Sequence, residues 1–471
     1  MVEYYDLIAF GTGSSMNIVS ALIEADPRIR VAVIENNMVG GICLTRGCIP
    51  SKMLLYPAVT VRRIREAKRL GIRARIERID FESIMERTYH YIYHESKMIE
   101  LSLKQHPRID LYQTTGTFVS DYTVDVGGKE IEGGKILLCT GSRPFIPPID
   151  GIDEVNYFTS DNFFRDFRKL PRKIVVIGGG FVAVELGFFL AMMGSQVTLI
   201  HKRPVIMHHE EPEISHLFQR DLSRYMIIKT NYKAVEVRKK EDKKVVTAEH
   251  VETGDVIEVE GDEILVAAGR RSNSDITKPE KTGVKTDERG WIITDEYLRT
   301  SKPDIWSCGD ANGKYMFKHK ANYESQILYH NAFHGENIRV DYHAVPHAVF
   351  TEPEIASVGM KEEEASKKYD ILVGYYRYQD TAKGEAMMVK EYFAKVIVDR
   401  ETLRILGAHI VGPEASILIQ EIVNLMYTHD GTAIPIFRGM HIHPALSEVV
   451  ERAFYNLREP EAWRHPHYHE H

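Results

Sequence analysis

The chain contains the same local pattern twice, and this duplication limits its possible folds more than any other feature. Each copy has an apolar run, a glycine-rich turn, a helix-length segment and a second apolar run, at residues 5–34 and 173–200. Such a βαβ unit places the turn at a helix N-terminus, where backbone N–H groups and the helix dipole favour a pyrophosphate. Two copies predict an α/β protein with two Rossmann-like dinucleotide-binding domains.

The first turn has the glycines that close contact with a dinucleotide requires. Gly11 and Gly13 allow a tight turn and a close approach of backbone to phosphate, and Glu35 follows the second strand, where an acid accepts hydrogen bonds from a ribose. Met16 stands in place of the third glycine, so helix and strand cannot approach as closely there. The motif alone is weak evidence, but its strand–turn–helix–strand context supports a dinucleotide site.

The second turn carries Gly178 and Gly180, and its unit ends in a basic sequence. Where NAD-selective proteins place an acid for the adenosine ribose, this chain has His201, Lys202 and Arg203. Up to three cationic donors could therefore bind a 2′-phosphate. A solvated basic turn is the alternative and predicts little discrimination. We expect NADPH, with NADH less favoured.

Length and composition narrow the class of protein. A chain of 471 residues is long enough for two to four domains, and 44% hydrophobic with 27% charged residues is typical of a globular protein. A net charge of −7, with Lys and Arg scattered among acids, gives no basic footprint for nucleic acid. Without an apolar run of membrane-spanning length or a signal peptide, we expect a cytoplasmic protein with no membrane partner.

Two of the four cysteines lie close together, in the segment 40–52. Cys43 and Cys48 could form half of a zinc site, but no further Cys or His ligands follow at regular spacing nearby. An inert core position is a second alternative, and a redox-active dithiol fits best. Cys139 and Cys308 end apolar runs and are expected to be small buried hydrophobic residues.

The sequence GGICLTRGCIPSK (40–52) resembles the active-site signature of the class I pyridine nucleotide-disulfide oxidoreductases. The resemblance runs the length of the chain, through LLCTGSRP (137–144), GGGFVAVE (178–185), AAGRRSN (267–273), CGDA (308–311), VFTEPEIASVG (349–359) and HIHPALSEVVE (441–451). It implies a glutathione reductase-like fold with a C-terminal α+β dimerisation domain. The expected domains are FAD-binding at 1–150 and 275–344, NAD(P)H-binding at 151–274, and interface at 345–471.

The resemblance also implies roles for individual residues. Cys48 is similar to the thiol beside the flavin, and Cys43 to the thiol that attacks the substrate disulfide. Lys52 resembles the lysine beside the flavin that pairs with an acid, here Glu185. Asp310 resembles the acid that holds the ribityl chain of FAD; without the resemblance it could equally be a turn residue.

A histidine near the C-terminus completes the predicted site. His443 could be a satisfied surface group, but thiol–disulfide exchange needs an acid–base group near neutral pH, and Glu448 would orient the ring. In the family this pair comes from the other subunit, which implies a homodimer. Phe181 matches an aromatic gate over the flavin or is a core aromatic; His441 is expected to be structural, and the His-rich tail 465–471 to be exposed without a functional metal.

These features predict an FAD-dependent NAD(P)H:disulfide oxidoreductase acting on a low-molecular-weight disulfide. Within the family the resemblance is greatest to mycothione reductases, with dihydrolipoamide dehydrogenases as the alternative. A mercuric reductase is disfavoured because no cysteine follows Cys308. A non-catalytic flavoprotein redox sensor should lack one of Cys43, Cys48, Lys52 or His443, and all four are present.

Overall fold

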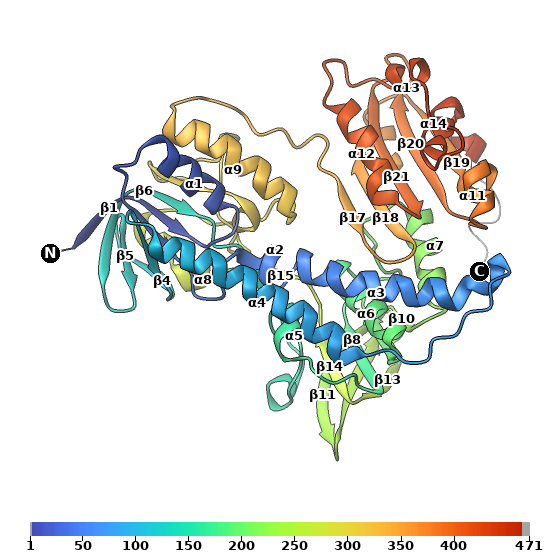
Figure 1. The fold of residues 1–471 in the computed structure, drawn as a ribbon, viewed down its shortest axis with the longest axis horizontal. Coiled ribbons are helices and arrows are strands. Elements are labelled where there is room, and N and C mark those ends of the chain that lie inside the picture. Colours follow the sequence, from blue (N-terminus) through green and yellow to red (C-terminus); the bar gives the residue numbers. More distant parts are fainter. Residues whose placement is uncertain (1, 464–471) are drawn as a thin grey trace.

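A computed structural model describes residues 2–463, which form three main sheets with helices packed on them (Figure 1). The first sheet has seven strands in the order β3-β2-β1-β6-β5-β4, with β16 paired to β6. Its strands are β1 (Glu3–Phe10), β2 (Val31–Ile34), β3 (Ile109–Tyr112), β4 (Gly116–Ser120), β5 (Thr123–Val126), β6 (Glu130–Leu138) and β16 (Ile305–Ser307). A strand from residue 305 onward thus completes a sheet begun by the N-terminal segment.

Helices from both ends of this region cover the first sheet. The helix α1 (Ser15–Ala25) contacts α9 (Lys318–Phe333), and both contribute to one apolar cluster with β1 and β2. The remaining helices before residue 110 are α2 (Gly41–Thr45), α3 (Cys48–Glu66) and α4 (Phe81–Gln105). Asp80 caps α4, since its side chain accepts a hydrogen bond from the Ser83 backbone N–H at 3.1 Å. In the sequence, apolar residues recur at helical spacing over 52–70 and 81–105. The helix α3 begins and ends four residues earlier than the first of these ranges, and α4 matches the second.

The second βαβ unit forms a four-stranded parallel sheet in the order β10-β9-β8-β14. Its apolar helix α6 is almost wholly buried and ends at Gly194, whose positive φ of 119° closes the C-terminus. The elements of this region are α5 (Ser160–Asp166), β8 (Lys173–Ile177), α6 (Phe181–Met193), β9 (Gln196–His201), α7 (Pro212–Leu222), β10 (Ile227–Thr230) and β14 (Glu263–Val266). An antiparallel sheet that we did not expect joins it, made of β11 (Tyr232–Lys240), β12 (Lys243–His250) and β13 (Val256–Gly261).

Short elements connect the second region to the first. The strands β7 (Ser142–Pro144) and β15 (Arg270–Ser272) pair antiparallel where the chain leaves and re-enters the first region, and α8 (Ser274–Thr277) follows. The two segments that connect the first and second regions, near residues 145 and 270, thus lie side by side. The boundaries predicted at 150 and 275 remain predictions, although this pairing agrees with them.

The C-terminal region is a six-stranded sheet in the order β17-β18-β21-β20-β19-β22, with helices against it (Figure 1). The strands are β17 (His347–Val349), β18 (Glu354–Gly359), β19 (Ile371–Arg377), β20 (Phe393–Asp399), β21 (Ile405–Gly412) and β22 (Leu457–Arg458). The helices are α10 (Glu362–Ser366), α11 (Ala382–Ala386), α12 (Ala415–Met426), α13 (Ile434–Arg438) and α14 (Ser447–Tyr455). All its strand pairs are antiparallel, as the predicted α+β architecture requires.

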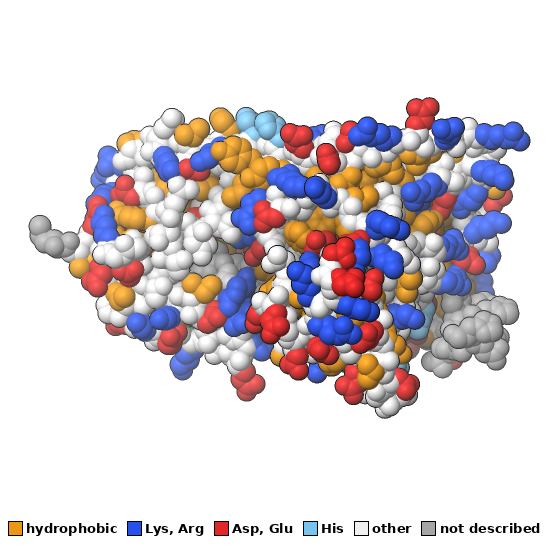
Figure 2. Space-filling model, turned by 90° about the horizontal axis from the view of Figure 1, so that it is seen from below, with side chains coloured by type: hydrophobic (Ala, Val, Ile, Leu, Met, Phe, Trp, Pro, Cys, Tyr) orange, Lys and Arg blue, Asp and Glu red, His pale blue; other side chains and the backbone are white. Residues whose placement is uncertain are grey.

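The C-terminal end of α3 and the segment that follows it are more basic than the scattered charges we expected. Residues 62–78 contain eight Lys or Arg and two Glu, and most of these side chains are exposed. This segment lies at the end of the molecule where α3 ends, and Figure 2 shows Lys and Arg side chains gathered toward that end. Within residues 2–463, none of the helices combines the length and the hydrophobicity needed to span a bilayer.

Candidate active site

The two cysteines of the predicted dithiol lie on consecutive helices. Cys43 belongs to α2 and Cys48 is the first residue of α3, with the chain turning between them at Gly47. Both are free thiols in the structure. A cysteine at the N-terminus of a 19-residue helix faces the positive end of the helix dipole, which favours a thiolate.

The two sulfurs differ in ionisation. A hydrogen bond from the Cys43 thiol lowers the pKa of Cys48 to about 7, and the positive charge of Lys52 acts in the same direction. The same hydrogen bond, together with burial, raises the pKa of Cys43 above its usual range. Above about pH 7 the pair therefore holds mostly a thiolate at Cys48 and a thiol at Cys43.

Lys52 is fixed by an ion pair from the second sheet region. Its Nζ donates to both carboxylate oxygens of Glu185, at 3.1 and 3.0 Å, so α3 and α6 are joined beside the cysteines. Glu185 is buried and also accepts the Phe350 backbone N–H at 3.0 Å. Lys52 Nζ lies 4.3 Å from the centroid of the Phe350 ring. Sequence reasoning predicted the pair but not Phe350, whose motif was recognised without a role for this residue.

The first glycine turn fits a dinucleotide pyrophosphate. Gly11 has a φ of +85°, and a Cβ there would lie 2.5 Å from the Cys139 carbonyl oxygen, so only glycine fits. At Gly13 a Cβ would meet nothing within 4 Å, so the outer side of the turn is open. Glu35 is buried and accepts hydrogen bonds from the Thr12 backbone N–H and hydroxyl, at 3.1 and 2.7 Å. Glu35 thus holds the turn itself; its predicted ribose contact stays a prediction.

Asp310 lies in a short 3-10 turn directly after β16. The Ser142 hydroxyl donates to its carboxylate at 2.6 Å, and Arg270 Nε lies 3.9 Å away. The preceding backbone is held from behind, because the Gly309 N–H donates to buried Glu324 at 2.7 Å. Asp310 is only part-buried, so its carboxylate is placed at the edge of the first sheet with capacity to accept a ligand hydroxyl.

The second glycine turn has the same construction. Gly178 has a φ of +140°, and a Cβ there would lie 2.1 Å from the Ala267 carbonyl oxygen, whereas a Cβ at Gly180 would meet nothing within 4 Å. The turn therefore packs against the Ala267 backbone at Gly178 and faces open space at Gly180, where α6 begins. These residues fit a second dinucleotide.

Phe181, the first residue of α6, belongs to an aromatic cluster. Its ring packs edge to face against Phe317 at 5.7 Å and against His347 at 5.8 Å between ring centroids. His347 in turn lies 2.7 Å from the carboxylate of buried Glu210. The cluster agrees with either a core aromatic or a gate, so the gate stays a prediction.

The basic sequence after β9 differs from our expectation at His201. Burial, followed by the nearby charges of His208 and of the basic residues, lowers the pKa of His201 to about 4. His201 is therefore neutral at physiological pH, and the expected three cationic donors are reduced to two, the exposed Lys202 and Arg203. Sequence reasoning missed His208, whose pKa burial also lowers to about 4, because the approach of the two rings, 5.8 Å between centroids, depends on tertiary packing.

His443 and Glu448 form the predicted acid–base pair. His443 Nδ1 lies 3.0 Å from the Glu448 carboxylate, and this hydrogen bond lowers the pKa of Glu448. Glu448 is buried and also accepts the Ala445 backbone N–H at 3.2 Å, whereas the His443 side chain is 68% exposed. The neighbouring His441 is part-buried between Glu421, at 3.0 Å, and Glu451, at 3.5 Å, as a structural residue would be.

The pair lies far from the cysteines within one chain. Figure 1 places α13 and α14 at the outer end of the C-terminal region, away from α2. The surrounding surface is apolar: Met440 is fully exposed and Ile442 is 78% exposed. The structure thus brings Cys43, Cys48, Lys52 and Glu185 together but leaves His443 apart from them.

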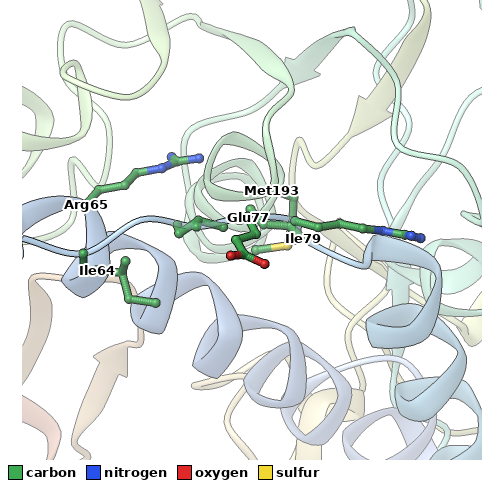
Figure 3. Close-up of a pocket in the computed structure, with 8 residues that line it drawn as sticks. Ile64, Arg65, Glu77, Ile79 and Met193 are labelled. Atoms are coloured by element: carbon green, nitrogen blue, oxygen red, sulfur yellow. The ribbon is translucent and has the colours of Figure 1, made fainter.

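Other candidate features lie outside this group. A surface hollow of about 450 Å³ is bordered by Ile64, Arg65, Glu77, Ile79 and Met193 (Figure 3). Ile64 lies sixteen residues after Cys48 along α3, about 24 Å at the helical rise, so the hollow is no part of the cysteine site. Among residues 2–463 no three His, Cys, Asp or Glu side chains are grouped to hold a metal. The histidines at 465–471 lie outside the described residues.

Comparisons with known proteins agree with this geometry. The family model described as pyridine nucleotide-disulphide oxidoreductase matches residues 13–325, and the dimerisation domain of that family matches residues 345–454. Mycothione reductase of Mycobacterium tuberculosis (strain H37Rv) is 36% identical over 470 residues, covering 97% of this chain and 100% of the relative. Dihydrolipoyl dehydrogenase of Thermus scotoductus is 33% identical over 455 residues, covering 96% and 97%.

A solved structure has the same overall fold. HOCl-induced flavoprotein disulfide reductase RclA from Escherichia coli superposes with a TM-score of 0.83 at 26% identity, covering 96% of this chain and 99% of that one. The predicted glutathione reductase-like fold is confirmed, and with it the family's cofactors, FAD and a nicotinamide dinucleotide. The chain belongs to the pyridine nucleotide-disulfide oxidoreductase family of flavin-dependent enzymes.

Proposed function

We propose that this enzyme uses NADPH to reduce a low-molecular-weight disulfide of the mycothione type. The observation that carries disulfide reduction is the divided ionisation of the cysteine pair, a thiolate at Cys48 beside Lys52 and a thiol at Cys43. One sulfur is thus prepared to face an electron carrier and the other to exchange with substrate.

The two glycine turns would hold the two dinucleotides. FAD would lie over Gly11 and Gly13, with Asp310 toward its ribityl chain, and NADPH over Gly178 and Gly180. When bound, FAD supplies the two-electron relay from the nicotinamide to the cysteine pair. The Lys52–Glu185 ion pair would lie between the two sites because it joins α3 to α6.

The substrate half of the reaction follows from the protonation states. Because the pKa of Cys43 is raised, its thiol needs a base before it can attack, and His443 held by Glu448 would supply one. Cys43 sulfur then attacks one substrate sulfur, and the departing thiolate takes the proton from His443. Cys48 thiolate attacks the Cys43 sulfur of the mixed disulfide, which releases the second product as a thiolate that takes a proton from solvent. A Cys43–Cys48 disulfide remains, to be reduced again.

A homodimer would bring His443 to the cysteines of the other subunit. Two observations support this arrangement: His443 is remote from α2 in its own chain, and the apolar side chains of Met440 and Ile442 beside it are exposed. The match of residues 345–454 to a dimerisation domain supports it as well.

The substrate assignment rests on the full-length similarity to mycothione reductase and is tested by a substrate panel. NADPH oxidation should be followed with mycothione, lipoamide, bis-γ-glutamylcystine and glutathione disulfide at matched concentrations. We expect mycothione to exceed each of the others in kcat/KM by at least about tenfold, equivalent to about 1.4 kcal/mol. Cys43→Ser is the control, since it should abolish turnover of every disulfide.

Two outcomes would contradict the proposal at different levels. Preference for lipoamide, together with use of NADH, would move the enzyme to the dihydrolipoamide dehydrogenases. Turnover that survives Cys43→Ser would refute the role of the cysteine pair itself.

A further inference from the structure

The other two cysteines, far apart in sequence, touch each other beneath the first glycine turn. The Sγ atoms of Cys139 and Cys308 lie 3.2 Å apart, although 169 residues separate them. Leu138 of β6 pairs with Ser307 of β16, and each cysteine is the residue that directly follows its strand. The expectation that both are merely small buried hydrophobic residues does not account for this contact.

The backbone geometry at this place is compatible with a disulfide. Neighbouring strands in a sheet lie about 4.8 Å apart, within the 4.4–6.8 Å range of Cα separations that a disulfide tolerates. Both sulfurs already meet on one face of the sheet, so closing the bond requires them to approach by about 1 Å.

The surroundings hold the two cysteines in place. On one side, the Gly309 N–H donates to Glu324, and Lys320 Nζ donates to the Gly309 carbonyl at 3.0 Å, so the residue after Cys308 is fixed by a buried ion pair. On the other side, the Cys139 carbonyl lies against the Gly11 turn. Neither backbone needs to move far.

We propose that Cys139 and Cys308 form a second redox-active pair, which closes into a disulfide between β6 and β16. The pair is separate from Cys43 and Cys48. It would fasten the strand that follows residue 304 to the sheet that carries the first glycine turn, and so strengthen the hold on FAD when the protein meets an oxidant. That last consequence rests on the proposed FAD site.

The reaction balances with a small hydroperoxide as the oxidant. Cys139, which is part-exposed whereas Cys308 is buried, attacks the peroxide with its sulfur and passes its proton to the departing oxygen, giving a sulfenic acid and releasing an alcohol or water. The Cys308 sulfur then attacks the sulfenic sulfur, forming the disulfide and releasing water. Two thiols lose two electrons and two protons, and the hydroperoxide is reduced.

The disulfide is tested in a holoprotein with the other pair removed. Cys43→Ser/Cys48→Ser leaves only Cys139 and Cys308 of the chain's four cysteines. The protein should be reduced with dithiothreitol, freed of reductant and treated with hydrogen peroxide, then alkylated and digested. We expect both thiols to be lost together, a linked peptide containing residues 139 and 308, and recovery of both thiols with dithiothreitol. The wild-type holoenzyme should give the same linked peptide.

Three results would contradict the proposed disulfide. One thiol could be lost alone, a sulfinic acid could form without a linked peptide, or both thiols could survive peroxide. The added Cys308→Ser substitution is the matched control and should give no dithiothreitol-reversible product beyond the sulfenic acid of Cys139.

The hold on FAD is tested by heating. The disulfide form should release FAD, detected by its fluorescence, at a temperature about 5 °C above that of the dithiol form. The Cys308→Ser protein should show no shift after peroxide. If the linked peptide forms but the release temperature of FAD does not change, the disulfide does not strengthen FAD binding. That result would contradict neither the disulfide nor the proposed reductase function.

Discussion

At the scale of single residues, the environment of Cys48 sets the pH above which this enzyme has a thiolate beside the proposed flavin site. In the Cys43→Ser holoenzyme, the long-wavelength thiolate–flavin absorbance should appear as pH rises through the pKa of Cys48, which the serine hydroxyl, as a hydrogen-bond donor in place of the Cys43 thiol, and the charge of Lys52 both lower. Removing the charge in Cys43→Ser/Lys52→Met should move this midpoint upward by about 1 to 3 pH units. The measurement is a spectrophotometric pH titration.

Two controls accompany that titration. Cys43→Ser/Lys52→Arg keeps the positive charge and should leave the midpoint near that of Cys43→Ser. Cys48→Ser should lack the band at every pH. A band that persists in Cys48→Ser would mean that the two sulfurs have exchanged roles.

The residue pairs at the site were predictable to different degrees. The pairs Cys43–Cys48 and His443–Glu448 are close in sequence, so a local motif carries them. The neutral His201 was not predictable, because its pKa depends on burial and on the approach of His208. The contact of Cys139 with Cys308 depends on strand pairing across 169 residues, which no local pattern reports.

At the scale of elements, the end of β9 should decide which nicotinamide is used. Lys202 and Arg203 are the exposed cations there, and charge-assisted contacts of about 1.5 to 3 kcal/mol each would give NADPH a preference of ten- to a few-hundred-fold in kcat/KM per contact. Lys202→Ala and Arg203→Ala, alone and together, should lose this preference stepwise when both nicotinamides are compared at fixed ionic strength.

Lys233→Ala is the matched control, since Lys233 is an exposed lysine of the adjoining β11, and it should leave the preference unchanged. His201→Gln should have a small effect, because His201 carries no charge near neutral pH. Wild-type enzyme that uses NADH as well as NADPH would refute the assignment.

The elements themselves were largely predictable where their pattern is local. The two predicted βαβ units, 5–34 and 173–200, agree closely with the bounds of the strands that begin and end them, β1 and β2 in the first unit and β8 and β9 in the second. The sheet of β11 to β13 was missed. Its strands expose many charged side chains, so their apolar residues do not stand out until the three strands pair.

At the scale of the whole molecule, the proposed active site requires two chains. His443→Ala should lower disulfide turnover by about 10²- to 10⁴-fold, because the exchange loses its acid–base group, while flavin reduction by NADPH survives. Random mixing of equal amounts of His443→Ala and Cys43→Ser subunits should restore about a quarter of wild-type activity, since half of the dimers would then contain one complete site.

Mixed dimers should be verified by native mass spectrometry before activity is measured. A histidine acting on the cysteines of its own chain would leave no complete site in any mixed dimer, so no recovery would contradict the proposed geometry. Slow flavin reduction in His443→Ala would instead indicate damage to the fold.

The pairing of β16 with β6 has a consequence for how the chain is made. β6 ends at Leu138, but its partner begins at Ile305, and Asp310 follows that partner. A growing chain on the ribosome therefore completes the βαβ unit of the second sheet while the side of β6 that pairs with β16 is still free. A chain that stops before residue 305 lacks both β16 and Asp310. If Asp310 holds the flavin as proposed, FAD would bind only to chains in which translation has passed residue 310.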